Sequence, residues 1–354
     1  MNKALLVDIG GTNMRYAIAS QESDNITDIN KLPFDSNDFE IHLKQLINEN
    51  NIKILVLSAA GPKINNSISM TNRNFIFNAN EIKDKFGLRE CFLLNDWEAI
   101  AYSYDYVSDS IEFIKEGSQF NKNTLFVGPG TGLGAALSIN NEIVLPSEIG
   151  NTTNSNLSLQ KNYNIENSDH LRLEDFISGS AISAVYKIKT NISTSSEEIY
   201  KKFTENDDIA IEVVNGFIKS LAQVLSDMAL TYLPGNGILL AGSLIRTIYP
   251  NINKEQFKEL FIGNKNDVHK NMLEMISIGV ITKQRTPLYG NFHFYKKLEF
   301  LFYIMKIAVD RDIPYIEIFV EQLSNEYGWD VIKFSNSSLN NQLIKDCDAI
   351  FVRS

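Results

Sequence analysis

The stretch that most constrains this chain is residues 128–134, GPGTGLG, which places four glycines in seven residues. Glycine loses more conformational entropy on folding than any other residue, so an ordinary loop rarely contains so many. An apolar run, Thr124–Val127, precedes the segment, and Ala135–Ile139 and Glu142–Leu145 follow it around an Asn-Asn turn. This pattern predicts strands joined by a glycine-rich turn whose backbone can approach a ligand closely.

The sequence excludes two other phosphate-binding motifs. A dinucleotide fingerprint must follow a strand and open a helix, whereas these glycines lead into a second apolar strand pattern. The sequence also contains no GxxxxGK[ST] segment, so it has no Walker P-loop.

A second glycine turn follows the predicted strand Ala4–Ile9, and a further strand resumes at Arg15–Ala19. Gly10 and Gly11 allow a sharp turn, and backbone N–H groups there, with a neighbouring threonine hydroxyl, can hold phosphate oxygens. Asp8, at the end of the first strand, can hold a hydrated Mg²⁺. An ordinary hairpin turn is the alternative interpretation of this stretch alone.

The dipeptide Asn95-Asp96 ends the predicted buried strand Cys91–Leu94 and precedes a helix predicted over Trp97–Tyr106. A carboxylate in that position can take the proton from a hydroxyl that attacks a phosphoryl group. The alternative is that Asp96 only caps the helix.

The remaining pattern is that of an α/β protein in which strands and helices alternate and the two halves repeat coarsely. Ile149–Asn167 is polar and reads as a loop, Asn80 is a plausible cap for the helix ending at Phe86, and Phe292–Val309 reads as a helix. The tail predicts a helix over Tyr315–Tyr327 and strands at Asp330–Phe334 and Ala349–Val352, which could join the first domain or form an interface.

Composition limits the partners and the compartment. The formal net charge of −10 and the lack of a basic run argue against nucleic acid. Cys91 and Cys347 fit neither a disulfide framework nor a metal knuckle, which favours a reducing cytoplasm. The N-terminus carries no signal-peptide pattern, and the longest apolar stretch, Leu298–Val309, is too short to span a membrane. Four scattered histidines, including His170, show no metal-ligand spacing.

Taken together and in order, these stretches resemble the bacterial glucokinases of the actin-like ATPase superfamily. The similarity covers residues 1 to about 290 and includes seven motifs: DIGGTNMR at 8–15, AAGP at 59–62 with Met-Thr-Asn at 70–72, LNDW at 94–97, GPGTGLG at 128–134, EDFISG at 174–179, LLAGSL at 239–244 and TPLYG at 286–290.

The resemblance implies a two-domain actin-like/hexokinase fold of the ribonuclease H-like type, with an interdomain cleft. The first domain would be residues 1–108 plus about 291–310, the second 109–290, and 311–354 a C-terminal extension of unknown role. The implied activity is ATP-dependent phosphorylation of the 6-hydroxyl of glucose, with Mg²⁺. We expect glucose or another hexose and ATP as partners, and neither nucleic acid nor a membrane. The sequence leaves open whether the chain forms a homodimer.

The same resemblance assigns site residues. Asp96 would be the general base, and Asp8 would hold Mg²⁺ through water. The other implied roles are sugar binding by Asn95, Glu148, Asn151 and Glu174, phosphate binding by Asp8, Gly10, Gly11, Thr12, Asn13, Gly130, Thr131 and Gly132, and adenosine binding by Gly242 and Ser243.

One departure from the family concerns the sugar. The family writes Glu-Gly-Gly-His where this chain has Glu148-Ile149-Gly150-Asn151, so a shorter amide that cannot become charged replaces the sugar-binding histidine. A kinase for mannose or an amino sugar therefore remains an alternative. A non-catalytic sugar sensor and an actin-like assembly ATPase are the alternatives from other classes.

Overall fold

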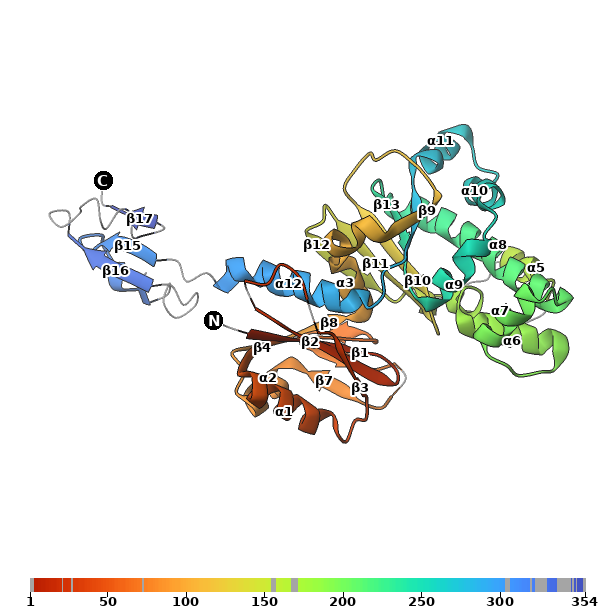
Figure 1. The fold of residues 1–354 in the computed structure, drawn as a ribbon. Coiled ribbons are helices and arrows are strands. Elements are labelled where there is room, and N and C mark those ends of the chain that lie inside the picture. Colours follow the sequence, from red (N-terminus) through yellow and green to blue (C-terminus); the bar gives the residue numbers. More distant parts are fainter. Residues whose placement is uncertain are drawn as a thin grey trace. The chain divides into compact units, whose positions relative to one another are not determined.

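The computed structural model describes residues 3–20, 22–26, 28–71, 73–153, 157–166, 171–302, 306–318, 320–321, 330–335, 345, 347 and 349–352. The chain forms two compact units, Met1–His293 and Phe294–Ser354. The first unit contains two large sheets, each with its own hydrophobic core (Figure 1). The predicted division into domains at residues 108, 290 and 310 stays a prediction.

The first sheet has the strand order β3-β2-β1-β4-β8. β1, β2 and β3 are antiparallel, whereas β1, β4 and β8 run parallel, so the carboxyl ends of these three strands meet at one edge. The core of this sheet includes four close aromatic rings, Phe34, Phe39, Phe75 and Phe77. The elements of this part are β1 (Lys3–Ile9), β2 (Asn13–Ala19), β3 (Asn30–Pro33), α1 (Phe39–Asn50), β4 (Ile52–Ala59), β5 (Lys63–Ile64), β6 (Ser67–Ser69), β7 (Ile76–Asn78), α2 (Ala79–Phe86) and β8 (Glu90–Asn95).

The second sheet repeats this plan and adds one strand, in the order β12-β11-β10-β13-β14-β9. Again three consecutive strands, β10, β11 and β12, are antiparallel, and the next two, β13 and β14, join in parallel. The added strand, β9, precedes them in sequence and pairs antiparallel with β14. The coarse repeat expected from the sequence is thus a repeat of topology. The strands are β9 (Ile111–Lys115), β10 (Thr124–Pro129), β11 (Leu133–Ile139), β12 (Ile143–Ser147), β13 (Gly237–Leu240) and β14 (Ile278–Ile281).

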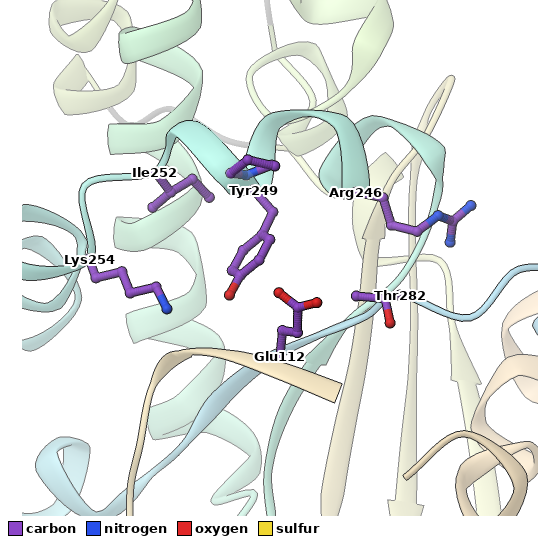
Figure 2. Close-up of a pocket in the computed structure, with 7 residues that line it drawn as sticks. Glu112, Arg246, Tyr249, Ile252, Lys254 and Thr282 are labelled. Carbon is purple, nitrogen blue, oxygen red and sulfur yellow. The ribbon is translucent and has the colours of Figure 1, made fainter. Parts of the chain in front are cut away.

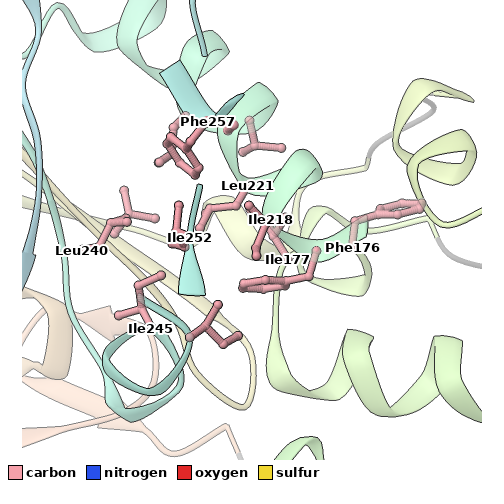
Figure 3. Close-up of a cluster of buried hydrophobic side chains, with 14 of the residues drawn as sticks. Phe176, Ile177, Ile218, Leu221, Leu240, Ile245, Ile252 and Phe257 are labelled. Carbon is pink, nitrogen blue, oxygen red and sulfur yellow. The ribbon is translucent and has the colours of Figure 1, made fainter. Parts of the chain in front are cut away.

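Helices cover the second sheet and form the largest core with it (Figure 3). The long helix α8 (Asp208–Tyr232) is apolar and long enough to cross a membrane, but Phe217, Leu221 and Leu225 are fully buried in this core. The other helices of this part are α5 (Leu157–Asn162), α6 (Gly179–Thr190), α7 (Ser196–Thr204), α9 (Ser243–Ile248), α10 (Lys254–Ile262) and α11 (Asp267–Met275), with 3₁₀ turns η2 (Ile149–Asn151), η3 (Leu173–Asp175) and η4 (Tyr249–Asn251).

Helices also connect the two sheets. α3 (Asp96–Tyr102), α4 (Tyr104–Val107) and the 3₁₀ turn η1 (Ser108–Ser110) follow the first sheet, and α12 (Thr286–Phe302) follows the second. Because α12 extends past His293, its last residues belong to the other unit.

The second unit contains a separate parallel sheet, ordered β16-β15-β17. It consists of β15 (Lys306–Asp310), β16 (Asp330–Phe334) and β17 (Ala349–Phe351), with Ile307, Val309 and Ile316 in its core. The two predicted tail strands are confirmed, but they pair with β15 and not with the first sheet. Part of the helix predicted at Tyr315–Tyr327 lies outside the described residues.

Several expectations about element boundaries were wrong. The segment read as a loop contains α5. The sequence did not reveal this helix because it is short and buries only Leu159, too few apolar residues to show a helical period. The helix predicted over Phe292–Val309 ends at Phe302 and is followed by β15, because an apolar run does not by itself distinguish a helix from a buried strand. The cap of α2 is Asn78, whose side chain accepts from the Glu81 N–H, and not Asn80.

We predict that Gly290→Ala destabilises the first unit. A β-carbon at Gly290 would lie 1.6 Å from the carbonyl oxygen of Ala99, so α12 could no longer pack against α3 without moving. We expect a loss of about 2–3 kcal/mol in the free energy of unfolding, typical of overpacking. Urea denaturation measures it.

Gly11→Ala is the matched control for this substitution. No atom lies within 4 Å of a β-carbon at Gly11, and its backbone is not in the left-handed region. The control should unfold at the wild-type midpoint, and equal midpoints for all three proteins would contradict the packing argument.

Candidate active site

Asp96 is the first residue of α3, directly after the last residue of β8. Its position is fixed by Asn95, whose side-chain oxygen accepts from the N–H groups of Trp97 at 2.9 Å and Glu98 at 3.3 Å. The Glu98 carboxylate in turn accepts from the Asn95 N–H at 3.1 Å, which completes a capping box. The cap of α3 is therefore Asn95, and Asp96 is left for another role.

Asn95 itself is 6% exposed, and its amide nitrogen donates to the carbonyl oxygen of Gly61 at 2.9 Å. Both ends of this side chain thus already have protein partners. The structure gives Asn95 a supporting function for Asp96, and its predicted contact with the sugar stays a prediction.

Trp97 joins the strand end to the second glycine turn. Gly128 and Gly134 are opposite each other in the β10–β11 hairpin, and the indole of Trp97 occupies the space that their missing side chains leave. A β-carbon at Gly128 would lie 1.7 Å from Cη2 of Trp97, and one at Gly134 would lie 1.6 Å from its Nε1. Two of the four glycines therefore serve packing and bring Asp96 beside the hairpin.

The helix that carries Asp96 packs on the second sheet although it follows the first. Ile100 and Ala101 of α3 share a buried cluster with Phe126 of β10 and Ala136 of β11. In Figure 1, α3 lies between the two sheets. Asp96 is consequently held by both halves of the unit.

Among the described residues, the two glycine turns have similar backbone hydrogen bonds and leave similar N–H groups unpaired. Gly10 N–H donates to the Asn13 carbonyl at 2.9 Å, and Gly130 N–H donates to the Gly132 carbonyl at 2.8 Å. Within the part of the chain that the structure describes, the next two amide N–H groups of each turn, those of Gly11 and Thr12 and those of Thr131 and Gly132, donate to no protein acceptor. Such groups can bind anionic oxygens.

Asp8 lies at the end of β1 and is 4% exposed. Arg15, its cross-strand neighbour, donates to one carboxylate oxygen at 3.1 Å, and the Ser58 hydroxyl lies 3.3 Å from the other. These contacts offset part of the cost of burial, but desolvation still raises the pKa of Asp8 above its usual value.

Three carboxylates from different elements influence one another here. Burial, followed by the negative charges of Asp8 and Glu148, raises the pKa of Asp96 to about 7, against a lowering hydrogen bond from the Trp97 N–H. Asp8 comes from the first sheet, whereas Glu148 follows the second. A half-buried carboxyl with a pKa near neutrality is suited to accept and release a proton.

The other predicted sugar-binding residues surround a single arginine that the sequence interpretation missed. Arg172 forms an ion pair with Glu174 at 2.6 Å and donates to the Asn151 side-chain oxygen at 3.3 Å. Glu174 also accepts from the Leu133 N–H at 3.3 Å, beside the second glycine turn. The Glu148 carbonyl accepts from the Asn151 N–H at 3.0 Å, which places these two residues in one turn.

The predicted adenosine segment lies at the same edge of the second sheet. Gly242 has φ of 119°, which only glycine adopts readily, and a β-carbon there would lie 3.9 Å from the carbonyl oxygen of Pro129. Ser243 begins α9 directly afterwards. Gly179, the first residue of α6, donates its N–H to the Gly130 carbonyl at 2.7 Å, so two helices begin next to the turn.

A pocket of about 560 Å³ lies on the far part of α9 and η4, between them and the edge strand β9 (Figure 2). Glu112 and Tyr249 point toward one another across it, and Arg246 points away from them. The residues predicted to bind ATP or sugar do not line it.

Two residues named from the sequence cannot be placed in the site. Asn72 of the Met-Thr-Asn stretch and His170 lie outside the described residues. Among the residues that the structure does describe, no group of three or more His, Cys, Asp or Glu side chains could hold a metal ion on its own. Glu98 could have been found from the Asn-x-x-Glu spacing, whereas Arg172 carried no local signal.

Solved structures with the same fold are sugar kinases. The crystal structure of a glucokinase from an Antarctic psychrotroph matches with a TM-score of 0.68 and 24% identity, covering 83% of this chain and 98% of that one. A ROK family glucokinase from Streptomyces griseus, in complex with glucose and AMPPNP, matches with a TM-score of 0.57 and 16% identity, covering 82% and 98%. The chain thus has the actin-like ATPase fold of these kinases.

The family follows from the sequence comparisons. The family model for glucokinase matches residues 5–298. Glucokinase from Colwellia psychrerythraea is 29% identical over 312 residues, covering 81% of this chain and 94% of that protein, and glucokinase from Saccharophagus degradans is 25% identical over 310 residues, covering 81% and 96%. The chain belongs to the glucokinase family, the ATP-dependent kinases that phosphorylate glucose. This result favours the kinase over the sugar sensor and the assembly ATPase.

We predict that Asp96→Asn stabilises the folded protein at high pH. Because burial raises the pKa of Asp96 from 3.8 to about 7, the unfolded chain releases this proton at a lower pH than the folded one. The stability that the protonated carboxyl contributes is present below about pH 4 and is lost as the pH rises through 7. Asparagine cannot ionise, so the variant should keep that stability at pH 8.5.

Urea unfolding of both proteins at pH 5.5 and pH 8.5 measures this effect. The free-energy advantage of Asp96→Asn should be larger at pH 8.5 than at pH 5.5. An advantage that does not change with pH would show that Asp96 is not desolvated in the folded protein.

Proposed function

We propose that this chain transfers the γ-phosphoryl group of ATP to the 6-hydroxyl of glucose, with Asp96 as the general base. The observation that carries the proposal is the position of Asp96, held by its capped helix beside both glycine turns. In the proposed step the Asp96 carboxylate accepts the proton of the 6-hydroxyl while that oxygen bonds to the γ-phosphorus. The bond from the γ-phosphorus to the β–γ bridging oxygen breaks, and ADP leaves.

Two pairs of backbone donors support the ATP assignment. The free N–H groups of Gly11, Thr12, Thr131 and Gly132 are suited to the phosphate oxygens, which matters because the chain carries a net charge of −10. Gly10, Asn13 and Gly130 would shape the two turns. Gly242 and Ser243 would lie against the adenosine, where a larger side chain would collide.

A magnesium ion bound with ATP fits the charges of this site. Asp8 and Asp96 are buried carboxylates whose pKa values are raised, so a nearby cation would stabilise their ionised forms. Asp8 would hold the ion through water, because its oxygens already accept bonds from Arg15 and Ser58. When bound, Mg²⁺ would neutralise phosphate charge during transfer.

Side chains beside the second sheet and on its neighbouring turns would bind the sugar by hydrogen bonds to its hydroxyl groups. Glu148, Asn151 and Glu174 supply acceptors and one amide donor, and Asn95 would add a further contact. Glucose is the sugar that we propose, in agreement with the family. The free state of Cys91 and Cys347 is consistent with the cytoplasmic location that we also propose.

The sugar assignment is tested by a coupled assay of ADP release over a panel of hexoses, with mannose and amino sugars included. We expect glucose to give the highest kcat/KM. Asn151→His, which restores the family residue, should keep glucose as the preferred substrate. Preference for another hexose would reject glucose but leave the kinase assignment intact.

Asp96→Asn should reduce kcat by about a hundredfold or more, since a positioned general base typically contributes that much. Circular dichroism checks the fold of the variant. Asp84→Asn, which removes an exposed carboxylate from α2, is the control and should keep wild-type turnover. A wild-type rate for Asp96→Asn would remove this residue from the mechanism.

The pH dependence of kcat/KM follows from the raised pKa of Asp96. Because the base must be ionised, kcat/KM should fall about tenfold per pH unit below an apparent pKa of about 7. Glu148→Gln removes one of the charges that raise this pKa, so its acid limb should move to lower pH. A profile whose limb does not move in that variant would contradict the coupling between these carboxylates.

A further inference from the structure

Arg172 makes three contacts with acceptors around the proposed sugar site. Its NH1 lies 2.6 Å from Oε1 of Glu174 and 3.3 Å from Oδ1 of Asn151, and its NH2 lies 2.9 Å from Oδ1 of Asp175. The Arg172 N–H also donates to the Asp175 carboxylate at 2.9 Å, which fixes the backbone from which the side chain extends. One guanidinium therefore bridges two of the residues proposed to bind the sugar.

The backbone brings these distant segments together. Thr153 and Arg172 form a β-bridge, and the Leu173 N–H donates to the Thr152 carbonyl at 3.1 Å. Asn151 comes directly before this pairing, at the end of η2, and Glu174 comes directly after it, in η3. The contact between Arg172 and Asn151 thus belongs to a defined register.

The chemistry of arginine determines which way the Asn151 amide points. A guanidinium has five N–H donors and no acceptor, so only the amide oxygen of Asn151 can face it. The amide nitrogen must then point away from Arg172, with its N–H groups available to another acceptor. Arg172 likewise holds one oxygen of Glu174, whose other oxygen accepts from the Leu133 N–H.

We propose that Arg172 is a positioning residue for the sugar. It turns Asn151 so that this side chain donates to a ring hydroxyl, and it holds Glu174 so that this carboxylate accepts from one. The resemblance to the family places a histidine at position 151, which has no amide oxygen and nitrogen that a guanidinium could orient. The shorter amide of this chain needs a partner to orient it, and Arg172 supplies that partner. This inference rests on the proposed function, which assigns the sugar to Asn151 and Glu174.

A purely structural function for Arg172 would have a different signature. Its side chain is 52% exposed, and exposed ion pairs contribute little to stability because water and salt screen them. Substitution should therefore leave the unfolding midpoint nearly unchanged while it weakens sugar binding. Within the described part of the chain, Arg172 forms no hydrogen bond or ion pair with Asp96 or with the glycine turns, so the chemical step should change little.

The test combines steady-state kinetics with calorimetric titration of glucose. For Arg172→Ala we expect KM and Kd for glucose to rise about tenfold, with kcat within about twofold of wild type, as for a lost ground-state interaction. Arg172→Lys keeps the charge without the planar fork and should lie between the two. Lys265→Ala, which breaks an ion pair with Asp227 of α8, should match wild type.

Repeating the Arg172→Ala substitution in a variant that lacks the Asn151 amide tests specifically whether Arg172 orients that amide. In Asn151→His, no amide needs orienting, so adding Arg172→Ala should raise the glucose Kd by clearly less than it does in the wild-type background. An equal rise in both backgrounds would overturn the orienting function. An unchanged glucose Kd and KM in Arg172→Ala, or a loss confined to kcat, would overturn it as well.

The outcomes separate this inference from the proposed function. If wild type binds glucose but releases no ADP, the proposed kinase reaction fails while the Kd series still decides the function of Arg172. If wild type turns over glucose and Arg172→Ala binds it equally well, the reaction stands and the inference falls. A wild-type chain that binds no hexose would overturn both.

Discussion

The site depends on one packing contact, the insertion of the Trp97 indole between Gly128 and Gly134. Any side chain at either glycine would overlap the ring, so the hairpin and the helix α3 can approach only because both positions lack a β-carbon. The residue before Trp97 is Asp96. This contact, together with the burial of Ile100 and Ala101 against the second sheet, ties a residue from the first sheet to the turn of the second.

A charge constraint follows from this packing. The chain buries Asp96 and brings Asp8 and Glu148 near it in a protein that is already acidic, and burial first, then these charges, raise the pKa of Asp96. Phosphate binding in such a place cannot rely on a cluster of lysines. It relies instead on backbone N–H groups that the two glycine turns leave unpaired, with a cation to balance the carboxylates. Burial, together with the repulsion that hinders anion binding, produces a base with a pKa near neutrality.

The sequence predicted where the motifs of the site lie, and the structure adds contacts of individual residues that the sequence did not indicate. Both glycine turns, the strand before Asn95 and the helix after it appear where the pattern placed them. Asn95 caps α3 and donates to the Gly61 carbonyl, a contact that the sequence did not indicate, and its predicted contact with the sugar stays a prediction. Gly128 and Gly134 were expected only as part of a glycine-rich turn that can approach a ligand, and the structure shows that they make room for the Trp97 indole. Gly61 and Trp97 are distant in sequence from Asn95 and from the hairpin respectively, so a local pattern could not reveal these contacts.

What the sequence determined by itself is local: where strands give way to glycine turns, that an acid follows a buried strand, and that a histidine of the family is replaced by Asn151. These features follow from backbone entropy, periodicity and the chemistry of single side chains. Only the tertiary structure decided which of these residues meet. The pairing of Thr153 with Arg172 brings a guanidinium to Asn151 and Glu174, and the second sheet brings its hairpin to Trp97. Such contacts depend on the register of strands and the packing of helices across many residues, which no short stretch of sequence specifies.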